Sequence, residues 1–204
     1  DNSRQGVIAK RYLYKRGLTE DDLLAYKIGI SNENEFINRV IFPSFSSDMK
    51  LNFYLSRSYD ENSIRKYKNC DAKKSEIIFD DYKINWQEEV ILVEGIFDSI
   101  KAGKNAIPVL GSWIDIKHEV YKKIINEKSN IVLAFDPDVR DKTMKIAKSL
   151  TEYGISVRVT ENLDCDIGDM TKEKANICIQ EAKKYELSNR IGYLIQSISS
   201  GSIF

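Results

Sequence analysis

Acidic side chains directly follow two apolar segments of the chain. Glu94 is the first residue beyond the apolar run 90–93, and Asp136 directly follows a second run. Asp138 comes two residues after Asp136. Such runs are typical of strands buried on both faces of a parallel sheet, and ligands bind beyond the carboxyl ends of these strands. Carboxylates gathered there repel one another unless cations neutralise them, and all-oxygen sites favour Mg²⁺ or Mn²⁺. The pattern therefore predicts a metal site with these three acids as ligands.

Further acids are expected at the same edge. Asp98 lies one helical turn beyond the first of these acids, so it can face the same site. An acidic loop, 164–169, follows a later strand, and we expect Asp166 to add a metal ligand, with Asp164 and Asp169 as alternatives. Single acids at helix N-termini are common because they complement the helix dipole. Helix capping by individual acids does not explain why three acidic segments occur at one edge of the sheet, whereas a metal site does.

The elements that must position these acids alternate between strand and helix patterns from residue 89 onward. Strands are expected at 90–93, 106–110, 131–135 and 155–159. Helices are expected at 96–102, 116–125, 142–153 and 172–185. This alternation predicts an α/β fold, in which a mostly parallel sheet has helices on both faces.

The first part of the chain has a different pattern. Two helical segments open it, the second capped by Thr19 after Gly17, and three short β-like segments follow at 40–43, 51–55 and 77–79. The polar segment 80–89 is predicted to be a hinge.

We therefore expect three parts. They are a basic α+β subdomain at 1–88, a sheet subdomain at 89–185 and a C-terminal helical tail at 186–204.

Composition excludes several classes of site. Lys and Arg balance Asp and Glu at 31 each, so positive charge for nucleic acid must be local. Three separated cysteines and one histidine favour neither a disulfide framework nor a zinc site. No apolar run approaches the length of a membrane span, and no signal peptide opens the chain. The sequence predicts a cytoplasmic protein without a membrane partner, and its abrupt start inside an amphipathic pattern suggests a fragment of something longer.

The local positive charge lies between Arg57 and Lys74. A solvated basic face is the ordinary interpretation of such a segment, although Tyr67 within it could stack on a base. By contrast, we expect Trp86 and Trp113 to be packing residues.

Several of these segments resemble known motifs. Glu94–Asp98 is similar to the first motif of toprim modules, and Asp136–Asp138 is similar to their paired Asp-x-Asp motif. Toprim modules also occur in topoisomerases, recombination proteins and nucleases. The upstream segments Tyr12–Thr19, Arg39–Pro43 and Lys66–Asn69 resemble the catalytic cores of bacterial and phage DNA primases, in the same order along the chain. The resemblance covers about residues 5 to 180.

The resemblance departs from the family pattern in three places. Pro137 stands where bacterial primases usually have Gly, and Leu55-Ser56 replaces a Gly-Gly pair. The clustered Cys and His residues of the family's zinc-binding module are not present in this sequence.

The resemblance implies a magnesium- or manganese-dependent nucleotidyltransferase. This enzyme would condense ribonucleoside triphosphates into short RNA primers on a single-stranded DNA template, with a replicative helicase as a further partner. It would act in the host cytoplasm if the protein is phage-encoded. The implied catalytic residues are Glu94, Asp98, Asp136 and Asp138. The implied nucleotide- and template-binding residues are Arg39, Arg57, Lys66, Tyr67, Asn69 and Lys74.

Two alternatives stay open from the sequence. A toprim nuclease would use the same acids to cleave phosphodiesters but would not require the Lys66–Asn69 segment. A catalytically silent module would bind nucleotides or a partner protein, although a complete set of toprim acids counts against it.

Overall fold

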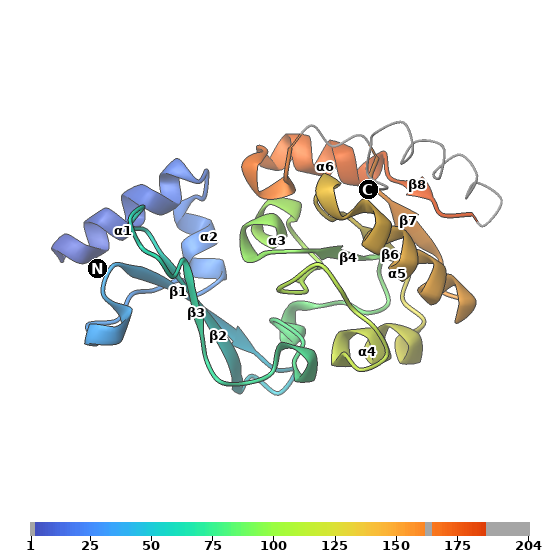
Figure 1. Ribbon diagram of the computed structural model, residues 1–204, viewed down its shortest axis with the longest axis horizontal. Helices are drawn as coiled ribbons and strands as arrows, with labels where there is room; N and C mark the ends of the chain where they lie inside the picture. The colour runs from blue at the N-terminus through green and yellow to red at the C-terminus, as the bar shows by residue number, and fades with distance from the viewer. Residues whose placement is uncertain (1–2, 162–164, 187–204) are drawn as a thin grey trace.

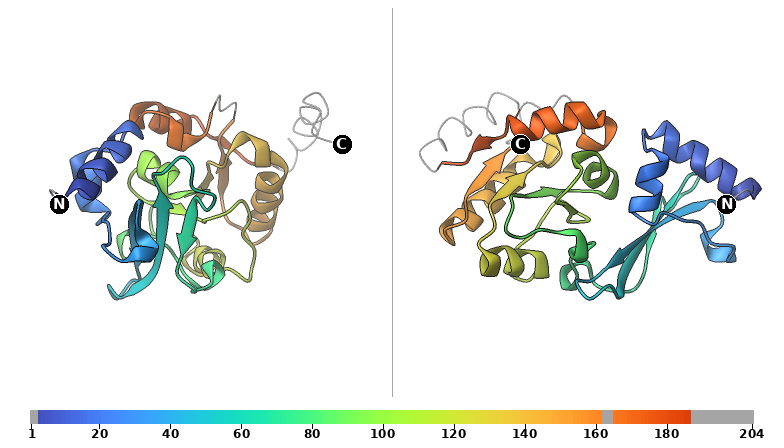
Figure 2. Two further views of the ribbon diagram at one scale, coloured as in Figure 1. Left: turned by 60° about the vertical axis from the view of Figure 1, so that its left-hand side comes forward. Right: turned by 180° about the vertical axis from the view of Figure 1, so that it is seen from behind.

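The computed structural model describes residues 3–161 and 165–186. These residues form two lobes, each built around its own sheet (Figure 1). We call residues 3–80 the N-terminal lobe and the remaining described residues the C-terminal lobe. The right-hand view of Figure 2 shows the N-terminal helices and sheet beside the larger sheet and its helices. The predicted helical tail falls outside the described residues, apart from Glu186.

The N-terminal lobe opens with two capped helices. Helix α1 (Arg4–Lys15) begins where the Ser3 hydroxyl accepts the Gly6 N–H at 3.0 Å. Gly17 then takes the left-handed conformation (φ +74°) that ends the helix, as its sequence position predicted. Helix α2 (Glu20–Ala25) begins with a reciprocal capping box between Thr19 and Asp22.

An antiparallel sheet completes this lobe. Its strands are β1 (Arg39–Phe45), β2 (Leu51–Ser58) and β3 (Tyr67–Asn69), paired in that order. The strand predicted at 77–79 is wrong. Phe79 is an apolar anchor, 2% exposed, and the next residue takes a left-handed φ of 51° that breaks an extended path. Short 3₁₀ turns connect these elements at Asn34–Phe36 (η1), Lys74–Glu76 (η2) and Asp81–Lys83 (η3).

The C-terminal lobe contains a five-stranded sheet in the order β5-β4-β6-β7-β8. The strands are β4 (Val90–Val93), β5 (Ala106–Pro108), β6 (Ile131–Leu133), β7 (Val157–Val159) and β8 (Lys183–Lys184). The first four are parallel, and β8 pairs antiparallel with β7. The mostly parallel sheet that the sequence predicted is therefore confirmed.

Helices cover both faces of this sheet. They are α3 (Ile96–Ala102), α4 (Glu119–Glu127), α5 (Arg140–Glu152) and α6 (Lys172–Gln180), with 3₁₀ turns η4 (Pro137–Val139) and η5 (Ile167–Asp169). Side chains of α4 and α5 pack on one face and side chains of α3 and α6 on the other.

Two predicted helix boundaries are wrong. Residues 183–184 leave the predicted helix because they pair with β7, and α4 starts at residue 119 because Asp115 and His118 form a turn before it.

The lobes share a core at α3. Ile96, Phe97 and Ile100 pack against apolar side chains of the N-terminal lobe. Polar contacts also join the lobes: the Lys101 ammonium donates to the Gly17 carbonyl at 2.9 Å, and Lys172 pairs with Asp22 at 2.5 Å. Among the described residues, none of the helices combines the length and apolar character needed to span a membrane.

The buried sheet predicts a strong effect of truncation. Leu133 in β6 is fully buried, so Leu133→Ala should destabilise the protein by about 2–5 kcal/mol, which lowers the unfolding temperature by roughly 5–15 °C. Leu24→Ala is the matched control because Leu24 is 71% exposed. Thermal unfolding followed by circular dichroism measures both, and equal melting temperatures for the two variants would contradict this packing.

Candidate active site

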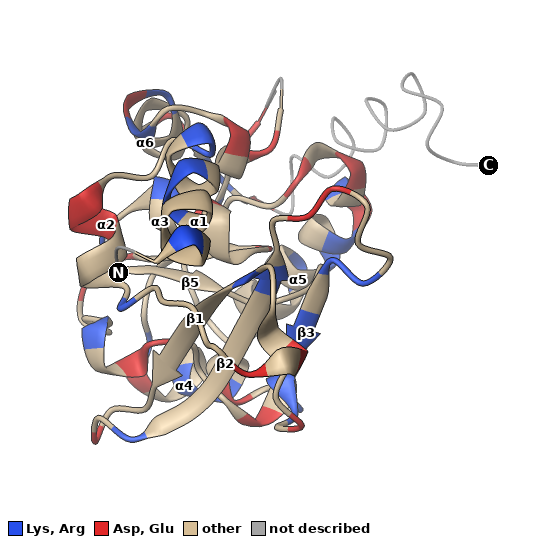
Figure 3. Cartoon of the chain, turned by 90° about the vertical axis from the view of Figure 1, so that its left-hand side faces the viewer, with Lys and Arg blue, Asp and Glu red and all other residues tan. Residues whose placement is uncertain are grey.

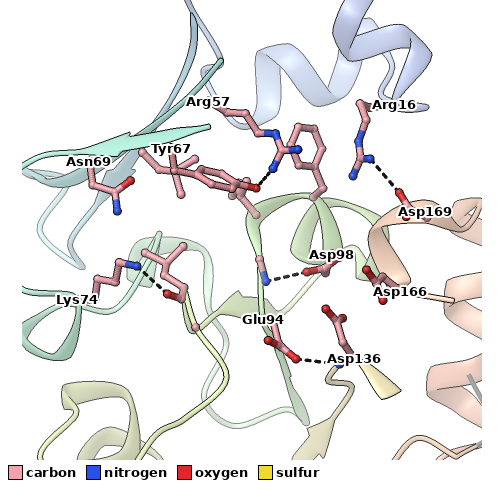
Figure 4. A pocket seen from close by; sticks show the side chains of 16 residues that line it. Arg16, Arg57, Tyr67, Asn69, Lys74, Glu94, Asp98, Asp136, Asp166 and Asp169 are labelled. Carbon is pink, nitrogen blue, oxygen red and sulfur yellow. Dashed lines mark hydrogen bonds and ion pairs between the residues drawn. The ribbon is translucent and has the colours of Figure 1, made fainter. Parts of the chain in front are cut away.

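A cavity of about 490 Å³ opens between the lobes (Figure 4). One wall is acidic and comes from the carboxyl edge of the parallel sheet. The opposite wall comes from the antiparallel sheet and the segment after it and carries cations, an aromatic ring and an amide. The charged and polar side chains that line it are Arg16, Arg57, Tyr67, Asn69, Lys74, Glu94, Asp98, Asp136, Asp166 and Asp169.

Three acids lie close enough together to share one cation. Oxygen atoms of Glu94, Asp136 and Asp138 lie within 4.8 Å of one another. The parallel pairing of β4 with β6 causes this, because it matches Leu92 with Leu133 and so places both strand ends at one edge. The Asp136 N–H donates to Glu94 Oε1 at 3.1 Å. Asp136 Oδ1 is buried without a hydrogen-bond partner in the part of the chain that the structure describes, so this donor set fits a hard divalent cation.

The cluster is electrostatically unfavourable without a cation. Burial raises the pKa of Asp136 to about 7, with further contributions from the charges of Asp98, Glu94 and Asp166. Burial also raises the pKa of Glu94, although the Asp136 N–H opposes this. The metal-free site therefore retains a proton near neutral pH, and a bound cation would favour its release.

Asp98 holds the acidic wall together. Its two carboxylate oxygens accept backbone N–H groups, from Gly95 at 2.7 Å and from Gly168 at 2.8 Å. The first bond fixes the turn after Glu94, and the second brings the loop of η5 to the site. Burial raises the pKa of Asp98, while these two hydrogen bonds oppose the shift. The geometry supports a positioning role for Asp98 within the predicted catalytic set.

The acidic loop contributes two of its three candidate side chains. Asp166 and Asp169 both line the cavity, and Asp169 pairs with Arg16 at 2.9 Å. Asp164 lies outside the described residues.

The opposite wall centres on Arg57. Its Nε donates to the Tyr12 hydroxyl at 2.9 Å, and its guanidinium also donates to the Tyr67 hydroxyl. The same guanidinium lies over the rings of Tyr67 and Phe97, at 4.6 Å and 5.6 Å from their centroids. These contacts fix the position of the Arg57 guanidinium on the wall that faces the acids (Figure 4).

Two of the predicted nucleotide-binding residues lie elsewhere. The Arg39 guanidinium donates to the carbonyls of Arg65 at 2.6 Å and Lys66 at 3.3 Å, so it supports the β2–β3 connection. Lys66 lines a second cavity of about 410 Å³, which shares Arg16 and Arg57 with the first. Tyr67, Asn69 and Lys74 line the main cavity, as does Arg57. Figure 3 shows the cationic positions along α1, of which Lys15 lines the second cavity.

Arg16 is a cavity residue that we did not single out as a site residue from the sequence. It belongs to the primase-like segment 12–19, which provided a signal, but its pairing with Asp169 depends on the contact between the lobes.

The raised pKa of Asp136 predicts a pH-dependent stability in metal-free buffer. The folded protein keeps a proton that the unfolded chain, with a pKa near 3.8, releases, so stability from this group falls as pH rises from about 4 to about 7. Asp136→Asn removes this loss and should raise the unfolding temperature by roughly 2–4 °C at about pH 8, and by less at about pH 5. The expected gain in unfolding free energy is about 1 kcal/mol, which is less than the whole pKa shift of Asp136 would give, because solvent screens the partly exposed carboxylate. Asp71 is an exposed acid that does not line the cavity, so Asp71→Asn is the control and should leave the unfolding temperature unchanged at both pH values. A lower unfolding temperature for Asp136→Asn at about pH 8 would contradict the electrostatic interpretation.

The close approach of Gly168 to Asp98 predicts a second effect. A Cβ atom at Gly168 would lie 2.4 Å from Asp98 Oδ1 and 3.2 Å from Phe97 Cβ. Gly168→Ala should therefore cost about 1–3 kcal/mol in unfolding free energy and weaken Mn²⁺ binding, because the η5 loop must move away. Gly29→Ala is the control, since the methyl group that it adds would enter open space with no contact within 4 Å. Unchanged Mn²⁺ affinity and stability in Gly168→Ala would show that this contact does not position the loop.

No protein-family model matches the sequence. The chain is similar to the DNA primase of Staphylococcus epidermidis, with 28% identity over 77% of this chain and 34% of the relative. It is also similar to the DNA primase of Lactococcus lactis, with 26% identity over 79% of this chain and 33% of the relative. The chain thus spans about a third of the length of the curated relatives it matches.

Several solved primase structures share this fold. The zinc-binding and RNA polymerase domains of the Aquifex aeolicus primase align over 90% of this chain and 57% of theirs, with TM-score 0.75 and 18% identity. A DnaG primase catalytic domain bound to single-stranded DNA aligns over 90% and 74%, with TM-score 0.72 and 18% identity. The Escherichia coli primase catalytic core aligns over 94% and 77%, with TM-score 0.70 and 19% identity. The resemblance indicated by the sequence motifs is confirmed: this chain has the toprim-type fold of the bacterial DNA primase catalytic core.

Proposed function

We propose that this chain is the catalytic core of a DNA primase, which condenses ribonucleoside triphosphates into a short RNA primer on single-stranded DNA. The observation that carries the proposal is the cavity whose acidic wall faces a wall of cations from the other lobe. Template-directed phosphoryl transfer needs both walls, because acids hold metal and cations hold phosphates. The similarity to curated DNA primases supports this choice among toprim activities.

The residues proposed to hold Mg²⁺ or Mn²⁺ are Glu94, Asp136 and Asp138. Asp166 of the same acidic wall would be a further ligand, with Asp169 as its alternative. A divalent cation bound there would make the primer 3′-hydroxyl a better nucleophile and neutralise charge on the phosphates. Glu94 would serve either as a metal ligand or as an acid–base group beside the 3′-hydroxyl. Asp98 would position both acidic segments through Gly95 and Gly168.

The opposite wall is proposed to bind nucleotide and template. Lys74 and Arg57 carry charges that match phosphate groups, and Tyr67 offers a ring and Asn69 an amide beside them. Asn69 Oδ1 is buried without a partner among the described residues, which suits a hydrogen bond from a ligand. Arg39 would act indirectly by supporting the β2–β3 connection, and Lys66 would extend the phosphate-binding surface into the second cavity.

Residues 1–88 would grip template and nucleotide, and residues 89–185 would hold metal. A replicative helicase would be a further partner, and the enzyme would act in the cytoplasm, of the host if it is phage-encoded. Cleavage of phosphodiesters would need the acidic wall but not the opposite cations, so the two reactions can be separated by substitution.

Substitutions on each wall should affect primer synthesis differently. Asp136→Asn should reduce synthesis on single-stranded DNA by roughly 100-fold or more, because it removes a ligand from the acidic cluster. Lys74→Ala should raise KM for ribonucleotides about tenfold, equivalent to about 1.4 kcal/mol, while Mn²⁺ affinity stays near normal. Lys122→Ala is the matched control, because Lys122 is exposed on α4 and pairs with Glu119.

The assay uses labelled ribonucleotides, Mg²⁺ or Mn²⁺ and sizing of the products. DNA degradation without nucleotides, together with no primer formation, would identify a nuclease and overturn the proposal. Normal nucleotide KM in Lys74→Ala would remove the role of the cationic wall.

A further inference from the structure

Trp113 is an exposed tryptophan beside the cavity. The sequence pattern indicated a packing role for both tryptophans, and this is correct only for Trp86, which is 9% exposed within the core of the C-terminal lobe. Trp113 is 41% exposed and belongs to none of the apolar clusters that the described residues form. Its exposure leaves a large aromatic surface available for a ligand.

One hydrogen bond within the loop favours a particular orientation of the indole ring. Trp113 Nε1 donates to Asp115 Oδ2 at 3.3 Å. Asp115 is itself fixed, because its Oδ1 accepts the Lys117 N–H at 2.9 Å and lies 2.9 Å from His118 Nδ1. Ile114, 1% exposed, anchors the loop in the core. Because this hydrogen bond uses the edge of the ring, it leaves the ring faces available, and it reduces the rotamer freedom that binding would cost.

This loop also forms part of the cavity wall. Leu110 and Gly111 line the cavity, and the Gly111 N–H donates to the Glu94 carbonyl at 3.3 Å. Trp113 follows Gly111 by two residues, which span about 7 Å at most. Figure 1 shows this loop, after β5, on the side of the C-terminal lobe that faces the N-terminal lobe. The Trp113 backbone therefore lies within about 7 Å of a residue that lines the cavity.

Two lysines contact the loop at residues that precede Trp113. The Lys74 ammonium donates to the Leu110 carbonyl at 2.9 Å, and the Lys142 ammonium donates to the Ser112 hydroxyl at 2.8 Å. Both side chains belong to exposed residues. Single-stranded nucleic acid is bound by exposed aromatic rings on a surface that also carries cations, since a base stacks on the ring while phosphates meet the cations.

We propose that Trp113 is a stacking platform for an unpaired base of a nucleic-acid strand that enters or leaves the cavity. The strand is either template DNA or nascent RNA, and this assignment of strands rests on the proposed function. The stack would hold the base next to the loop that contacts Glu94. Trp113 would thus fix the position of the strand along the cavity without contacting the reacting atoms.

Tryptophan fluorescence tests the stack directly. Single-stranded oligonucleotides of DNA and of RNA are titrated into the protein in parallel. Both should quench the emission of the unmodified protein, and the tighter of the two identifies the preferred strand. In Trp113→Phe the remaining signal comes from buried Trp86 and should not respond. Quenching that persists in Trp113→Phe, or no quenching by either strand in the unmodified protein, would overturn the inference.

Affinity measured by anisotropy of a labelled oligonucleotide separates stacking from charge. Trp113→Ala should weaken oligonucleotide binding about 5- to 100-fold, because alanine cannot stack on a base. Trp113→Phe should retain most of the affinity of the unmodified protein, because a phenyl ring can stack. The salt dependence should keep its slope in Trp113→Ala, whereas Lys142→Ala should reduce that slope by about one unit. Ile116→Ala, at a 49% exposed aliphatic residue of the same loop, is the control and should bind normally.

Primer synthesis by the same proteins separates this inference from the proposed function. If the unmodified protein makes primers and Trp113→Ala binds strands as tightly as it does, the platform is wrong and the proposed function stands. If no primers form but quenching depends on Trp113, the platform stands and the proposed function fails. A large fall in unfolding temperature for Trp113→Ala would instead assign the residue to packing.

Discussion

The repulsion between carboxylates at one edge of the parallel sheet is the constraint on which the rest of the site depends. Glu94 and Asp136 are brought together by the pairing of β4 with β6, whose side chains are almost completely buried. The sheet is thus rigid enough to hold an arrangement that is unfavourable by itself. Burial and neighbouring charges raise the pKa of Asp136, and its buried Oδ1 has no hydrogen-bond partner among the described residues. A cation would relieve both.

The second wall of the cavity depends on how the lobes meet. Helix α3 belongs to the packing of both lobes, and it also begins with the turn that Asp98 stabilises. Asp98 joins this turn to the η5 loop, and Asp169 of that loop pairs with Arg16 of the N-terminal lobe. The distance between acids and cations is therefore set by packing at α3 and by a few polar contacts. Substitutions in those contacts would alter the shape of the cavity without changing the acidic residues themselves.

The sequence predicted the acidic wall well because strand ends in parallel sheets meet at one edge, which made Glu94 and Asp136 neighbours. It predicted the basic wall less well because adjacent residues of a strand point in opposite directions. Tyr67 and Asn69 face the cavity, whereas Lys68 pairs with Glu35. The Arg16 contact, the short strand β8 and the exposed position of Trp113 depend on tertiary packing, which local patterns do not encode.

Calorimetric titration with Mn²⁺ tests the central claim most directly when it is repeated in buffers of different ionisation enthalpy at about pH 6.5. Because the pKa of Asp136 is raised to about 7, a cation that binds there should displace a proton. The observed heat should then depend on the buffer, and Mn²⁺ affinity should increase as pH rises through about 7. Binding that releases no proton and has the same affinity across this range would contradict a cation site at the strained acidic edge.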